Sequence, residues 1–112
     1  METTRAIEVF SAFPDEEKME FLACVAHALT ILARDSYEVG QDGLTNPVRV
    51  RTIIEIEHRV TSHLLALLRG DSDRYPDDVL VRIILEHPHD LTLQQQLHAV
   101  WASLSAQAAA AA

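Results

Sequence analysis

The chain has 112 residues, of which 48% are apolar, and it contains only three glycines and four prolines. This length and composition predict a single globular, helix-rich domain with one hydrophobic core rather than a disordered or all-β chain. The formal net charge is −8 at pH 7, with Lys18 the only lysine among nine basic residues. It argues against nucleic acid and anionic membranes as partners, because both bind through clustered positive charge.

Targeting signals are not recognisable in the sequence. It opens without a secretory signal, and no apolar run reaches the roughly 18 to 20 residues that a membrane-spanning helix requires. The single cysteine, Cys24, rules out an internal disulfide and a zinc site made of several cysteines. We therefore expect a cytoplasmic protein whose partners are proteins or small molecules.

Residues 1–12 include Ile7, Val9 and Phe10, which are enough for a short N-terminal arm or helical turn that packs on the body. A first helix is predicted over residues 13–37, with Pro14 at its first position and three acidic residues in its first turn. Its apolar side chains fall on one stripe at helical spacing, and the opposite face is expected to be solvated. The stripe consists of Phe21, Leu22, Val25, Leu29 and Leu32.

A second helix follows the stretch "EVGQDGLTNP", whose glycines and Asn-Pro pair predict a loop. Asn46 is expected to cap this helix, which starts at Pro47, runs to Arg69 and stops at Gly70.

Two shorter patterns complete the chain. The segment "PDDVLVRIILEH" predicts a third helix from Pro76 that is apolar nearly all round and should lie deep between its neighbours. A fourth helix starts at Asp90 or Thr92 and presents a core stripe, which we expect to pack on the first helix. The fourth-helix stripe consists of Leu93, Leu97, Val100, Trp101 and Leu104.

These elements predict an all-α protein, a four-helix bundle with antiparallel or irregular packing. The bundle spans residues 13–107, the arm residues 1–12 and an alanine tail residues 108–112. We assign no function to the tail.

An acidic residue interrupts the apolar face of the second helix. At about 100° per residue, an arc close to half the circumference is apolar, yet Glu57 and Thr61 fall inside it. The apolar members are Val50, Ile53, Ile54, Val60, Leu64, Leu65, Leu67 and Leu68. Either Glu57 pairs with an arginine or hydroxyl of a neighbouring helix or meets water in a groove, or part of the arc is not core.

The second alternative predicts an interface. An arc too wide for one small core would leave Ile54, Glu57, His58, Thr61 and Leu65 for contact with another protein, and a homodimer is the simplest case. The chain is then a small non-enzymatic interaction or regulatory module. Replacing His58 should change only its affinity.

A different function follows from the run "EIEHRVTSHLLALL", residues 55–68. It resembles the phosphoacceptor helix of histidine-kinase dimerisation domains, whose pattern reads approximately Glu-x-x-His-Arg-Val-x-Asn-x-Leu. Glu55, His58, Arg59, Val60 and Leu64 match, while Thr61 and Ser62 replace the family's Lys-Asn pair. The resemblance implies that His58 accepts a phosphoryl group beside Glu55. Without a glycine-rich ATP-binding segment, the chain could serve only as a phosphotransfer or kinase-docking protein.

Metal and nucleophile chemistry find little support in the sequence. Glu55 and His58 have a spacing used in di-iron bundles, but the only second copy, Glu86 and His89, is interrupted by Pro88. We therefore expect no metal site and no cofactor. Cys24 has only His27 as a nearby base, and a structural thiol is the commoner interpretation. No sequence pattern of a phosphate-binding loop or a catalytic triad is present, so an enzymatic activity is not predicted.

Overall fold

The computed structural model describes residues 2–38 and 47–111, and these residues form five α-helices and one short 3₁₀ turn, with no strand among them. The helices are α1 (Thr3–Ser11), α2 (Asp15–Glu38), α3 (Pro47–Leu68), α4 (Asp77–Leu85) and α5 (Leu91–Ala111), and the 3₁₀ turn η2 is Ser72–Arg74. The all-α class is confirmed. The described residues contain five helices where a four-helix bundle was predicted, so the four-helix bundle is not confirmed.

The additional helix is α1, at the place where an arm was expected. Ala6 and Phe10 lie one helical turn apart and are both fully buried, so the segment has an inward face of its own. Phe10 lies 5.8 Å from both Phe21 and Trp101 between ring centroids. Of the two alternatives, an arm or a helical turn that packs on the body, the segment forms the helical one. The few apolar residues, read without their partners, did not reveal that Phe10 lies fully buried in the core.

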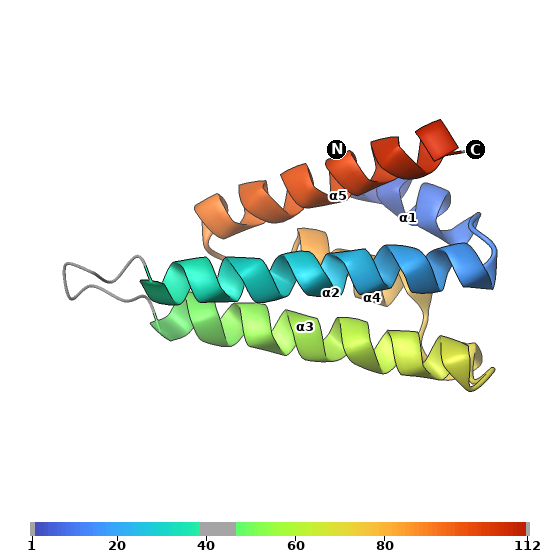
Figure 1. The fold of residues 1–112 in the computed structure, drawn as a ribbon, viewed down its shortest axis with the longest axis horizontal. Coiled ribbons are helices and arrows are strands. Elements are labelled where there is room, and N and C mark those ends of the chain that lie inside the picture. Colours follow the sequence, from blue (N-terminus) through green and yellow to red (C-terminus); the bar gives the residue numbers. More distant parts are fainter. Residues whose placement is uncertain (1, 39–46, 112) are drawn as a thin grey trace.

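Helices α2 and α3 run antiparallel side by side, and α5 lies along the other side of α2, with α4 behind them (Figure 1). The predicted contact between the first and last long helices is confirmed. Trp101 of α5 meets Phe21 of α2 edge to face at 4.7 Å between ring centroids, and Leu97, Val25 and Leu29 belong to the same core cluster. Aromatic pairs of this geometry add to the stabilisation that burial provides.

The ends of the helices follow partly from capping chemistry. Asp90 accepts a hydrogen bond from the backbone N–H of Leu93 at 3.1 Å, so it is Asp90 rather than Thr92 that caps α5. The same carboxylate also pairs with Nε of Arg49 on α3 at 2.6 Å, and the Arg49 and Leu93 hydrogen bonds lower the pKa of Asp90. The predicted cap Asn46 lies outside the described residues.

Helix α4 is less buried than its sequence suggested. Leu80, Val81, Ile84 and Leu85 face the core, but Val79 is exposed. None of the helices in the described ranges combines the length and apolarity that crossing a bilayer demands.

Candidate functional site

Helix α3 has two parallel rows of residues, each with alternating spacings of three and four. The inward row is buried and consists of Ile53, Ile56, Val60, His63 and Leu67. The outward row, which we call the α3 ridge, is exposed and consists of Ile54, His58, Thr61, Leu65 and Leu68. The predicted apolar arc therefore combined members of both rows, since Ile53, Val60 and Leu67 are buried whereas Ile54, Leu65 and Leu68 are exposed. It also left out Ile56 and His63, which are buried.

Four of the five predicted interaction residues lie on the α3 ridge. Ile54 is 54% exposed and Leu65 is 43% exposed, and His58 and Thr61 are exposed between them. Leu68, another member of the predicted apolar arc, is 63% exposed at the C-terminal end of the ridge. The structure thus joins these side chains into one outward surface.

Glu57, the fifth, lies apart from the ridge. Its side chain is half-buried where α3 meets α2, and its Oε1 accepts a hydrogen bond from the hydroxyl of Thr30 at 3.2 Å. A hydroxyl partner on a neighbouring helix, one of the alternatives considered for Glu57, is thus present. Part of the apolar arc is also not core, since Ile54 and Leu65 are exposed. Because the carboxylate is not fully buried, it avoids the large desolvation cost of a buried unpaired charge.

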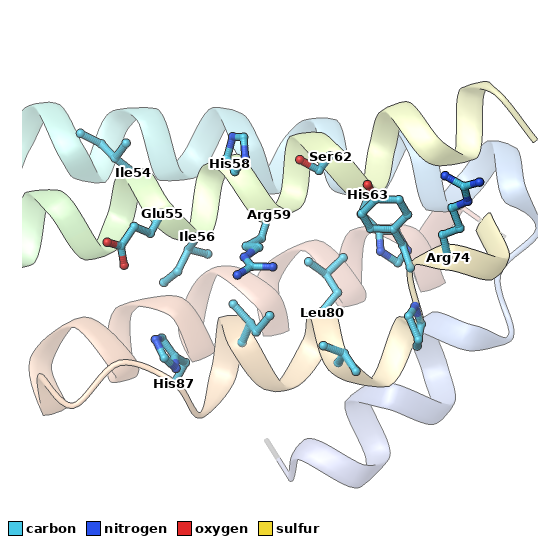
Figure 2. A pocket seen from close by; sticks show the side chains of 14 residues that line it. Ile54, Glu55, Ile56, His58, Arg59, Ser62, His63, Arg74, Leu80 and His87 are labelled. Atoms are coloured by element: carbon cyan, nitrogen blue, oxygen red, sulfur yellow. The ribbon is translucent and has the colours of Figure 1, made fainter. Parts of the chain in front are cut away.

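A groove of about 1050 Å³ runs between α3 and α4 beside the ridge. Figure 2 shows Glu55, Ile56 and Arg59 on the α3 side of this α3–α4 groove, with Leu80 and His87 on the facing side. Val79 and Ile83 add apolar surface. The groove is lined by two arginines, Arg59 and Arg74, and by three histidines. Glu55 is the single acidic residue of the lining. Arg74 is paired with Asp71 at 3.5 Å, whereas Arg59 forms no ion pair within the described residues.

His58 lies where the ridge and the groove meet. The side chain is exposed, and Glu55, one helical turn earlier, is exposed as well. The two residues that the family resemblance singled out therefore share one accessible surface. Accessibility is necessary for phosphotransfer, because the imidazole must reach a phosphoryl donor on another molecule.

His63 closes one end of the groove and is the main residue that sequence reasoning missed. It is 2% exposed, and its Nε2 lies 3.0 Å from Oδ1 of Asp77 at the start of α4. Because an ionised carboxylate only accepts hydrogen bonds, Nε2 donates. The other carboxylate oxygen of Asp77 accepts a hydrogen bond from Nζ of Lys18 on α2 at 2.8 Å. One carboxylate thus links α2, α3 and α4.

Aromatic rings complete the surroundings of His63. Its ring lies 6.3 Å from that of Phe10 and 6.2 Å from that of Tyr75, between centroids. Burial lowers the pKa of His63, although the hydrogen bond and the charge of Asp77 oppose that shift. This environment favours the neutral imidazole. The sequence did contain a signal that His63 is buried, because apolar residues lie on the same helical row at i−7, i−3 and i+4. These residues are Ile56, Val60 and Leu67.

The remaining candidate groups stay separate. Within the described part of the chain, no cluster of three or more His, Cys, Asp or Glu side chains has the geometry to hold a metal ion. His58 is exposed while His63 is buried, so these two imidazoles of α3 do not share one site. Cys24 is exposed.

Comparison with known protein families, with curated proteins and with solved structures found no match to this chain.

Proposed function

We propose that the chain is a small non-enzymatic helical module that works by binding another protein through the α3 ridge. The observation that supports this most directly is the row of Ile54, Leu65 and Leu68 on the outward side of α3. A helix on the surface of a monomer normally places polar side chains on that side. Single exposed apolar residues are common, whereas an aligned row of them is typical of a contact surface.

A photo-crosslinking experiment tests this proposal. A photoreactive amino acid at Leu65 should capture a partner, while the same group at Gln96, an exposed position on α5, should not. The captured protein is then purified and its affinity measured directly. We expect Leu65→Glu to weaken binding about tenfold or more, because it places a charge in the centre of the contact, and Gln96→Glu to leave it unchanged. Equal capture from both positions, or an unchanged affinity for Leu65→Glu, would refute the proposal.

A second candidate function is histidine phosphotransfer through His58. It is favoured by the exposure of His58 and Glu55 beside a groove lined by Arg59 and Arg74, whose guanidinium groups suit a phosphoryl group. A ring nitrogen would attack phosphorus, and the P–O bond to a donor aspartate would break as the P–N bond forms. The aspartate carboxylate is the leaving group, and Glu55 would orient the ring and accept its proton.

Labelling from a phosphorylated response regulator separates the two functions. Phosphotransfer predicts acid-labile, base-stable phosphate on the wild type that His58→Gln abolishes and His27→Gln, at an exposed position on α2, retains. An interaction module predicts no label from any donor, and only a change in affinity for His58→Gln.

A further inference from the structure

We infer that the α3 ridge fits a second copy of this chain, bound with the two α3 helices antiparallel about a two-fold axis near Thr61. This inference rests on the proposed function, because it requires that the ridge be a contact surface. It identifies the partner and fixes its orientation.

The spacing of the ridge supports a helix as the partner. Ile54, His58, Thr61, Leu65 and Leu68 are separated by four, three, four and three residues. This alternation keeps side chains on one line where two helices pack along each other. The inward row of α3 has the same spacing and packs against other helices of the bundle. A second copy presents an identical row, so the contact would be self-complementary, as two-fold interfaces require.

Charge determines the orientation. Glu55 and Arg69 flank the ridge on the same side of the helix, near its two ends. Both are exposed, and neither forms an ion pair within the described ranges. In a parallel pair, Glu55 would lie level with Glu55 of the second copy and Arg69 with Arg69. An antiparallel pair instead places opposite charges near each other at both ends.

The register follows from the positions relative to Thr61. Glu55 lies six residues before Thr61 and Arg69 eight residues after it, so in the antiparallel pair their levels differ by about 3 Å at about 1.5 Å per residue. Long side chains easily span that difference. Ile54 and Leu68 are each seven residues from Thr61, so the same register places the two apolar ends of the ridge opposite each other.

A charge-swap experiment tests the pairing. Wild-type protein at 150 mM NaCl should sediment at twice the monomer mass of 12.5 kDa. Glu55→Arg and Arg69→Glu should each raise the dissociation constant roughly five- to tenfold, since each places like charges together at two symmetric sites, and the double variant should restore it to within about threefold. Glu20→Arg and Arg34→Glu make the same charge changes at exposed positions on α2 and should have no such effect.

Disulfide trapping tests the orientation. In a Cys24→Ser background, oxidation should link two copies of Thr61→Cys. Ile54→Cys should not link to itself but should link to Leu68→Cys. Self-linking of Ile54→Cys, with no link between Ile54→Cys and Leu68→Cys, would show a parallel pair and overturn the inference. Circular dichroism of each variant checks that the helices still form.

The inference and the proposed function fail in different ways. A wild-type chain that sediments as a monomer up to about 1 mM overturns the second copy as partner. If Leu65 then crosslinks to a different protein, the proposed function stands. If Leu65 captures neither a second copy nor another protein, both are wrong.

Discussion

At the scale of single residues, the two notable histidines of α3 illustrate how position decides role. His63 is buried against Asp77, while His58, five residues earlier, is exposed. Both occur in rows with alternating spacings of three and four. The chemistry of an imidazole is the same in either row, so burial and partners, which come from other helices, separate a structural histidine from a reactive candidate.

The buried histidine should make stability depend on pH. Since the folded state lowers the pKa of His63, the unfolded chain binds a proton at a higher pH than the native protein does. Stability is therefore fully present above the unfolded pKa of about 6.5 and falls as the pH decreases from there toward the lowered pKa, by at most about 1.4 kcal/mol per pH unit for one proton. Urea melts between pH 7.5 and 5.5 should show this slope. His63→Gln should reduce it, whereas His27→Gln should keep it.

Glu57 should matter little for stability. Its carboxylate is half-buried and accepts one hydrogen bond from an exposed threonine, so Glu57→Gln, which keeps an acceptor, should change the free energy of unfolding by less than about 1 kcal/mol. Urea melts of the two proteins measure this. A loss above about 3 kcal/mol would mean that Glu57 is a buried, paired charge instead.

At the scale of the helices, local signals predicted the starts better than they predicted the packing. Pro47 begins α3 as expected, and the loop residues after Leu68 end it. The fourth predicted helix begins at Leu91, directly after its cap Asp90. What local signals could not show is which row of α3 faces inward. Both rows are mostly apolar and both contain a histidine, so the choice depends on Asp77 and Phe10, which lie far away in the sequence.

The cap of α5 provides a test at this scale. Asp90→Ala removes both the hydrogen bond to the Leu93 N–H and the ion pair with Arg49, and we expect it to lower the free energy of unfolding by about 1 to 2 kcal/mol. Thr92→Ala is the matched control, because Thr92 is exposed and was the alternative cap; it should cost less than about 0.5 kcal/mol. Equal losses in denaturant melts would contradict the assignment of Asp90 as the cap.

At the scale of the whole molecule, the ridge and the net charge have opposite effects on self-association: the apolar ridge favours it and the net negative charge opposes it. The groove and ridge hold several of the chain's cationic and apolar residues, whereas most of the 17 acidic residues lie elsewhere. Composition alone predicted a surface that repels polyanions. Composition could not show where on that surface two acidic chains could bind each other. The fold was needed for this, because only the fold shows that Glu55 and Arg69 flank the two ends of one exposed ridge.

This opposition predicts an unusual salt dependence for self-association. Two chains of charge −8 repel each other over the Debye length, which is about 30 Å at 0.01 M salt and about 8 Å at 0.15 M. In the dimer that we infer, the two exposed Glu55–Arg69 ion pairs would contribute only about 0.2 to 1 kcal/mol each, so at low salt the long-range repulsion would outweigh them. We therefore expect the dissociation constant of the dimer to fall as NaCl rises from about 10 to 150 mM and to change little beyond that. Sedimentation equilibrium at four salt concentrations measures it. If the affinity instead decreased steadily with added salt, ion pairs rather than apolar contacts along the ridge would hold the two copies together.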